Sequence, residues 1–144
     1  MRISRAERGF TLVETLIALA IVAGLASLAV VALAPSRERG LLEMSVAQLR
    51  AALSQARLLA MTRDETIPVA VNEQSRSITS RAGTITLPER VLIAVTVDDG
   101  AVLAFHRDGS ASAAQIRLSA GLHERLITVD WLSGETRVSA GDEQ

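Results

Sequence analysis

The sequence contains no cysteine, no lysine and no tyrosine, and its 144 residues include only three aromatic side chains: Phe10, Phe105 and Trp131. Without cysteine, the chain has no disulfide, no thiolate metal site and no cysteine nucleophile. All 15 basic side chains are arginine, which we interpret as a compositional bias of the source. The formal net charge of −1 argues against a globally basic nucleic-acid binder. An apolar content of 49% is too high for a disordered chain, so the main question is where the apolar residues lie.

A large share of them lies near the start of the sequence. The run from Phe10 to Ala34 contains a single ionisable side chain, Glu14. As a helix this run would be about 37 Å long, at about 1.5 Å per residue, which is enough to cross a hydrocarbon core of about 30 Å. Three arginines and one glutamate precede it. The positive-inside rule therefore predicts that residues 1–9 lie in the cytoplasm and that the chain after the run lies outside.

Three interpretations of this run compete. A cleaved secretory signal has an apolar core of about 7–15 residues, which is shorter than this run. A plain membrane anchor explains the length but leaves Glu14 unexplained, because a carboxylate near a membrane end is unfavourable unless it is paired or functional. In the third interpretation a leader ends at Gly9, and the apolar segment stays on the mature protein.

The residues Arg8-Gly9-Phe10-Thr11-Leu12-Val13-Glu14 resemble the class III signal of type IV pilins and pseudopilins. The resemblance implies that a prepilin peptidase cleaves between Gly9 and Phe10 and N-methylates Phe10. Gly9 has no side chain, so the scissile bond can lie close to peptidase groups. Glu14 lies one helical turn after Phe10 and can neutralise the new amine of its own chain or of a neighbouring subunit; the family precedent is the neighbour. The alternative is a Glu14 that reaches the membrane interface without a partner.

The segment 41–62 has the periodicity of an amphipathic helix. Its apolar positions are spaced alternately by four and three residues: Leu42, Val46, Leu49, Leu53, Ala56 and Ala60. Glu43, Arg50, Ser54 and Arg57 are predicted on the other side of the helix. We expect this helix to continue from the membrane segment and to pack its stripe on a sheet. Pro35 and Gly40 weaken the helix between the two parts, and whether it bends there is left open.

After Asp64 the sequence is typical of short strands separated by turns. Strands are predicted at 67–71, 77–81, 84–87, 91–97, 101–106, 115–118, 126–131 and 136–138. The fold class is therefore predicted as α+β and pilin-like, with a long N-terminal helix, half membrane and half amphipathic, on an antiparallel β-sheet region. The predicted parts are a leader over 1–9, a transmembrane or filament-core helix over 10–34 and a periplasmic globular domain over 35–144.

Two C-terminal motifs resemble the minor pseudopilin H (GspH) family of type II secretion. They are the strand ending in Phe105 with the turn Asp108-Gly109-Ser110, and the hairpin Val129-Asp130-Trp131-Leu132-Ser133-Gly134. The chain departs from the family at Arg107, where a proline is usual. The resemblance implies a structural subunit of the periplasmic pseudopilus, anchored by a single pass in the inner membrane of a Gram-negative bacterium. The implied partners are the major pseudopilin G, the minor pseudopilins I, J and K, and the prepilin peptidase.

A type IV minor pilin of the FimT type is the alternative, with a role in pilus assembly or DNA uptake. A DNA-binding pilin needs a basic surface patch. From Leu122 onward the chain has only Arg125 and Arg137 against five acids. Nucleic-acid binding is therefore not expected.

No catalytic, metal or cofactor site is predicted, so we expect neither an enzyme nor a small-molecule substrate. The acids of Asp98-Asp99-Gly100 are too few for calcium. His106 and His123 lack metal-ligand spacing. His106, Asp108 and Ser110 share one turn, whereas a catalytic triad gathers distant residues. Trp131 is predicted as a core or sheet-packing anchor rather than a binding hot spot.

Overall fold

The computed structural model describes residues 11–98 and 102–141, with the side chains of 28–36 left out of the description. Contacts divide the chain into two compact units, Met1–Pro35 and Ser36–Gln144. One helix, α1 (Leu12–Arg63), supplies residues to both units, and its helical backbone continues through Pro35 and Gly40.

In the first unit, the described side chains from Thr11 to Ser27 are all exposed. They include large apolar residues such as Leu12 and Leu19, which are 76% and 70% exposed. Within the described residues, none of the helical stretches combines the length and the apolar character needed to cross a membrane.

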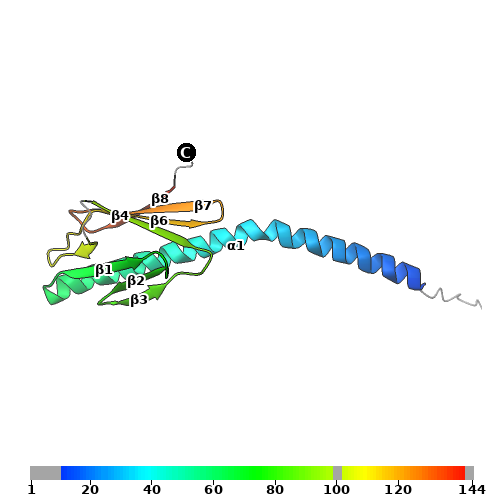
Figure 1. Ribbon diagram of the computed structural model, residues 1–144, viewed down its shortest axis with the longest axis horizontal. Coiled ribbons are helices and arrows are strands. Elements are labelled where there is room, and N and C mark those ends of the chain that lie inside the picture. The colour runs from blue at the N-terminus through cyan, green and yellow to red at the C-terminus, as the bar shows by residue number, and fades with distance from the viewer. Residues whose placement is uncertain (1–10, 99–101, 142–144) are drawn as a thin grey trace, which may run out of the picture. The chain divides into compact units, whose positions relative to one another are not determined.

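The second unit contains the C-terminal part of α1 and two four-stranded sheets (Figure 1). The first sheet has the order β3-β2-β1-β5. Its strands are β1 (Ile67–Asn72), β2 (Ser77–Ser80), β3 (Gly83–Thr86) and β5 (Ala104–Phe105). All of its pairings are antiparallel, with Ile78 opposite Val71 and Ile85 opposite Ile78.

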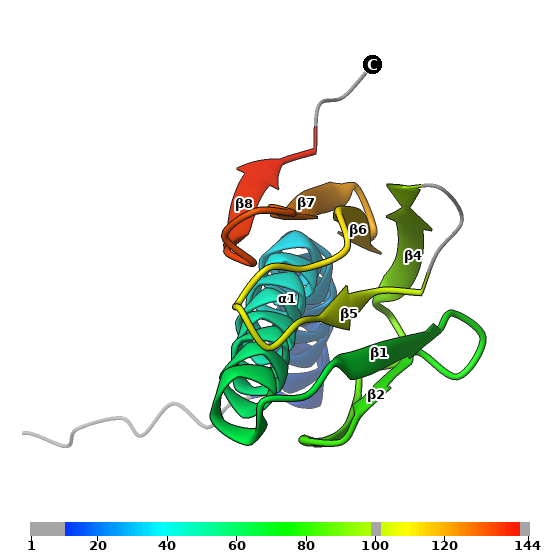
Figure 2. The same ribbon diagram turned by 90° about the vertical axis from the view of Figure 1, so that its left-hand side faces the viewer.

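The second sheet has the order β4-β6-β7-β8 and is also antiparallel. Its strands are β4 (Leu92–Val97), β6 (Ala114–Ala120), β7 (His123–Val129) and β8 (Thr136–Ala140). In β6 the buried residues alternate with residues that are exposed or only partly buried, which is the pattern of a sheet with one face in the core. Figure 2 looks along α1 and shows β6, β7 and β8 on one side of the helix and β1, β2 and β5 on another.

The predicted stripe of α1 is confirmed, because all six of its residues are at most 5% exposed: Leu42, Val46, Leu49, Leu53, Ala56 and Ala60. They form one core with buried residues of both sheets. The only aromatic side chain in this core is Phe105 of β5, which is fully buried. The prediction of an α+β fold with a long N-terminal helix and antiparallel sheets is also confirmed.

Several details of the prediction are wrong. Of the strand predicted over 101–106, Ala101 lies outside the described residues, and among the rest only Ala104 and Phe105 pair with β1, as β5. The strand predicted from Leu126 begins at His123, since the ladder with β6 extends to the pair Ala120–His123. Trp131 follows the end of β7 and is 62% exposed, so it is not a core anchor.

Candidate functional site

The predicted cleavage site, Gly9–Phe10, and the predicted methylation site, Phe10, lie outside the described residues. The third predicted residue, Glu14, lies in the first turn of α1. Its backbone N–H donates a hydrogen bond to the hydroxyl of Thr11 at 3.3 Å. Thr11 therefore acts as the N-cap, and Glu14 occupies the third helical position, as in the first half of a capping box.

This position favours a carboxylate. The free N–H groups of the first turn and the helix dipole place partial positive charge near Glu14. The side chain is exposed, and within the described part of the chain it makes no ion pair. The start of α1 thus presents the exposed Glu14 carboxylate, four positions after Phe10 in the sequence.

Among the residues described, no three histidine or acidic side chains lie close enough together to hold a metal ion. Asp98 directly follows β4, whereas Asp99 and Gly100 lie outside the described residues. His106 shares a 3.3 Å hydrogen bond between its Nδ1 and the hydroxyl of Thr66.

The turn Asp108-Gly109-Ser110 is held by local hydrogen bonds. Asp108 Oδ1 accepts from the Ser110 hydroxyl at 2.6 Å and from the Ser110 backbone N–H at 3.0 Å. These two hydrogen bonds stabilise the charged carboxylate and hold the pKa of Asp108 below its ordinary value, and the bond from the Ser110 hydroxyl has the larger effect. The backbone N–H of His106 donates to the Ser110 carbonyl at 2.9 Å. His106, Asp108 and Ser110 thus build one turn.

The turn between β7 and β8 is organised by Asp130. Its Oδ1 accepts hydrogen bonds from the backbone N–H groups of Leu132 (3.2 Å) and Ser133 (2.8 Å) and from the Ser133 hydroxyl (2.9 Å). The hydrogen bonds from Ser133 stabilise the charged carboxylate and hold the pKa of Asp130 below its ordinary value. The bond from the Ser133 backbone N–H has the largest effect, and the bond from its hydroxyl comes second. With Asp130 turned inward to the backbone, Trp131 and Leu132 are left 62% and 67% exposed.

The two turns meet α1 through Arg57. The guanidinium Nε of Arg57 donates to the Gly109 carbonyl at 3.1 Å, and the Ala111 backbone N–H donates to the Trp131 carbonyl at 2.9 Å. Arg57 is half-buried, so its prediction as a residue of the solvent side is wrong. The periodicity places it correctly next to the stripe, but its partner is a turn 52 residues away, and no local signal indicates that contact.

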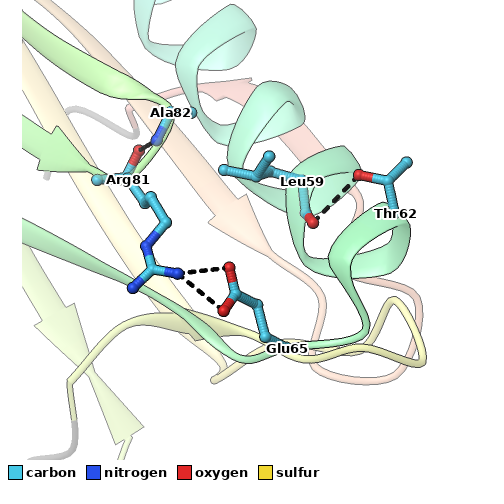
Figure 3. Close-up of polar contacts among 6 residues, drawn as sticks. Leu59, Thr62, Glu65, Arg81 and Ala82 are labelled. Carbon is cyan, nitrogen blue, oxygen red and sulfur yellow. Dashed lines mark hydrogen bonds and ion pairs between the residues drawn. The ribbon is translucent and has the colours of Figure 1, made fainter.

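Among the described residues of the second unit, three ion pairs lie on the surface. Figure 3 shows Arg81, between β2 and β3, with its guanidinium turned to the Glu65 carboxylate that follows α1, at 2.7 Å. Arg125 of β7 pairs with Glu43 of α1 at 2.7 Å, and Arg117 of β6 pairs with Glu124 at 2.9 Å. Exposed pairs of this kind contribute at most about 1 kcal/mol each. They also compensate three of the arginines that a nucleic-acid surface would need.

Comparison with known proteins matches the N-terminal segment to a sequence motif and most of the chain to solved structures. Residues 4–34 match the prokaryotic N-terminal methylation motif. Two solved structures of the minor pseudopilin EpsH from the type II secretion system of Vibrio cholerae are similar to this chain, at 14% identity and TM-scores of 0.60 and 0.61. These matches cover 71% and 73% of this chain and 98% and 97% of EpsH.

A type IV minor pilin, FimU of Pseudomonas aeruginosa, is similar at 15% identity and a TM-score of 0.52, over 68% of this chain and 92% of FimU. Among curated protein sequences there is no significant match. At these identities the structural likeness establishes the fold. The chain therefore combines the methylation motif of prokaryotic prepilin-like proteins with a pilin-like α+β fold.

We predict that Gly134→Ala destabilises the second unit by at least about 2 kcal/mol, from a left-handed backbone and a steric clash. Gly134 has φ +64°, and a Cβ there would overlap the Gly109 carbonyl and lie 2.9 Å from Arg57 Nε. Urea unfolding of the detergent-solubilised chain measures the change. Gly40→Ala is the control, because open space and helical geometry there predict a gain of up to about 1 kcal/mol. A Gly134→Ala chain as stable as the wild type would contradict the contact.

We also predict that the stabilising effect of Asp130 depends on pH. Its pKa is lowered in the fold, so its contribution is present above the ordinary value of 3.8 and is lost as the pH falls through the folded-state value. Asp130→Asn should lower the Tm at about pH 7, and the difference from wild type should narrow as the pH falls below 3.8. Glu89→Gln, which removes the charge of an exposed acid, should leave the Tm unchanged throughout this pH range. An Asp130→Asn difference that is constant with pH would contradict the role of the charge.

Proposed function

We propose that the chain is a minor pseudopilin of the type II secretion system, a structural subunit of the tip region of the periplasmic pseudopilus. One observation carries the proposal: the methylation motif over residues 4–34 precedes a globular unit with the fold of the minor pseudopilin EpsH. The chain would help to export folded proteins across the outer membrane, without catalytic activity of its own.

In this proposal the apolar segment over 10–34 inserts once into the inner membrane of a Gram-negative bacterium, and the globular unit lies in the periplasm. A prepilin peptidase removes residues 1–9 and methylates Phe10. The segment then leaves the lipid and packs against the helices of other subunits, where van der Waals contacts replace lipid contacts. The exposed apolar side chains between Leu12 and Leu25 supply such a surface.

Glu14 is proposed to pair with the N-terminal amine of a neighbouring subunit. An amine and a carboxylate attract strongly at low dielectric, whereas either charge alone is costly to bury. The capped first turn supports this role, because it fixes the backbone of Glu14 relative to Thr11. The pairing would set the stagger between subunits.

The proposed partners are the major pseudopilin G and the minor pseudopilins I, J and K. Neither nucleic acid nor a small-molecule substrate is proposed. The charge pattern supports this choice, because Arg125 and Arg117 are already paired with Glu43 and Glu124.

A type IV minor pilin, involved in pilus assembly or DNA uptake, is the second candidate, and the similarity to FimU favours it. It predicts that the purified chain shifts DNA in a gel at moderate salt, with an affinity that falls steeply as salt is added. Our proposal predicts no shift under these conditions and co-purification with pseudopilins instead. DNA binding without those partners would favour the pilin.

The proposal predicts a mature N-terminus at N-methyl-Phe10, measured by mass spectrometry of chain isolated from membranes with and without prepilin peptidase. A start at Met1 in both samples would refute it. Glu14→Ala should still be cleaved and methylated, but its incorporation into filaments should fall by about tenfold or more, because truncating one partner of a buried charge pair costs about 2–5 kcal/mol.

Two variants in the same turn control this experiment. Thr15→Ala removes a hydroxyl that donates only to the Leu12 carbonyl (2.8 Å) and the Thr11 carbonyl (3.3 Å), so it should assemble normally. Glu14→Asp keeps the charge and should restore part of the incorporation. Normal assembly of Glu14→Ala would remove the pairing role while leaving the processing result intact.

A further inference from the structure

Strand β8 is the last strand of the second sheet, and its far side is open within the described residues. In the order β4-β6-β7-β8, only β7 pairs with it. Figure 2 shows β8 at one end of this sheet, beside α1. All of its residues after Thr136 are exposed. An edge of this kind carries backbone donors and acceptors to which another chain can pair.

The ladder between β7 and β8 determines which backbone groups of β8 face outward. The Asp130 N–H donates to the Glu135 carbonyl at 3.0 Å, and the Gly141 N–H donates to the Glu124 carbonyl at 3.3 Å. Both bonds keep the register of the ladder, so the odd-numbered residues of β8 bond to β7. Because hydrogen-bonding directions alternate along an antiparallel strand, the even-numbered residues point their N–H and C=O groups away from β7. They are Thr136, Val138 and Ala140.

The opposite edge of the same sheet differs from β8. At the edge strand β4, the Glu73 carboxylate accepts a hydrogen bond from the Val95 backbone N–H. In the part of the chain that the structure describes, no side chain takes up an outward donor of β8 in this way. The strand also contains no proline, which would interrupt pairing. The open edge of β8 can therefore accept an added strand.

A groove of about 350 Å³ lies between the start of β8 and α1. Thr136 and Val138 are paired with Val129 and Ile127, which are buried in the core, so their side chains lie on the face of the sheet that packs on α1. Five residues of α1 form the other wall: Arg50, Ser54, Arg57, Leu58 and Met61. A strand added to β8 would direct alternate side chains into this groove.

The groove is basic. Arg50 is exposed and Arg57 is half-buried, and neither forms an ion pair among the described residues. The Arg57 Nε donates to the Gly109 carbonyl at 3.1 Å, which fixes this guanidinium at the end of the groove. Glu135 is the one acid among the lining residues. The net charge of the groove is therefore positive and complements an acidic side chain.

The direction of β8 relative to α1 sets the position of this charge along the edge. Arg125, which is opposite Ala140, binds Glu43 of α1, so the end of β8 lies towards the earlier turns of the helix. Thr136, at the start of β8, lines the groove with the two arginines. An added strand that is antiparallel to β8 would therefore bring its C-terminal residues to Arg50 and Arg57.

A second copy of this chain does not suit the open edge. Antiparallel pairing of two β8 strands would make the α1 helices of the two globular units run in opposite directions, because β8 has a fixed direction along its own α1. In the proposed function both chains start in the same membrane, so their α1 helices must run the same way. The partner is then a segment of a different protein.

We infer that the edge of β8 binds an extended, acidic segment of another protein, which adds to the sheet as an antiparallel strand and places a carboxylate beside Arg50 and Arg57. The choice of a different protein rests on the proposed function, whereas the open edge and the basic groove do not. Main-chain hydrogen bonds would supply affinity, and the two arginines would select the acidic sequence.

Selection from a phage-displayed library of random decapeptides tests the inference, with the full chain held in detergent micelles. Enriched peptides should carry aspartate or glutamate in their C-terminal half, after β-branched residues. Fluorescence anisotropy should show that a synthetic consensus peptide binds about tenfold more tightly than its copy with glutamine at each acid. Binding should slow amide hydrogen exchange over residues 136–140 and leave β4 unchanged.

Two substitutions at one position test the backbone contact. Val138→Pro removes an outward N–H without removing a bond to β7, which is a position where strands tolerate proline. It should lower the affinity for the consensus peptide by about tenfold. Val138→Ala, which keeps the N–H, should change the affinity by about twofold at most. Circular dichroism establishes that both variants are folded.

Arg50→Glu tests the charge and does not depend on the folding of Val138→Pro. It should lower the affinity for the consensus peptide by about tenfold, because it places two acids together. Arg90→Glu makes the same change at an exposed arginine between β3 and β4 and should leave the affinity unchanged. An equal effect of both substitutions would overturn the role of the groove.

The remaining outcomes either overturn the site or separate it from the proposed function. A library that yields no binder, a consensus without acids, unchanged exchange over 136–140 or full affinity of a folded Val138→Pro would each overturn it. Sedimentation that shows a dimer, lost in Val138→Pro, would identify a second copy as the partner and overturn the choice of a different protein. A chain that binds the peptide but is not cut to N-methyl-Phe10 in its host keeps the site and refutes the proposed function. A processed chain without peptide binding does the reverse.

Discussion

Burial of one face of α1 against both sheets is the interaction on which the globular unit depends. The backbone ladders stay within each sheet, β3-β2-β1-β5 and β4-β6-β7-β8. What unites them is the core that contains the stripe from Leu42 to Ala60 together with residues of both sheets. Each fully buried leucine or isoleucine contributes about 1.5–3 kcal/mol relative to exposure. With Phe105 as its only aromatic, the core relies on close packing of aliphatic side chains around a single helix.

The polar contacts of the unit act at its margins and decide which surfaces stay open. The Asp130 carboxylate accepts hydrogen bonds from N–H groups of the β7–β8 turn. Arg57 of α1 donates a hydrogen bond to the Gly109 carbonyl in the neighbouring turn. The turns are thereby fixed beside α1 without covering its outer face. The Glu73 carboxylate accepts from the Val95 backbone N–H at 3.0 Å, which occupies one free donor at the edge strand β4. A side chain that takes up an edge donor in this way reduces uncontrolled strand pairing at that strand.

Much of this arrangement could be predicted because its signals are local. A four-and-three spacing of apolar residues specifies which face of a helix is buried, and the six residues so chosen are all in the core. The wrong details are those decided by distant partners. The charged start of β7, His123 to Arg125, does not look like a strand, yet its ladder to β6 and the pair between Arg125 and Glu43 hold it in one. Composition places Trp131 in the core, whereas Asp130 ends the strand and leaves the indole outside.

The outer face of α1, where Met44, Leu58 and Met61 are exposed, shows the same contrast between local and distant signals. The spacing of its residues is a sequence signal as local as the spacing of the buried stripe. A helix with apolar rows on both faces has no single amphipathic direction, however, so the periodicity indicates only the more strongly apolar row. Structure separates the two rows, because the sheets cover one and leave the other exposed. A pseudopilin and a type IV minor pilin share this framework, as the likeness to both EpsH and FimU indicates. On this chain the surfaces that the core leaves open include the groove beside Arg50 and the exposed Trp131-Leu132 turn.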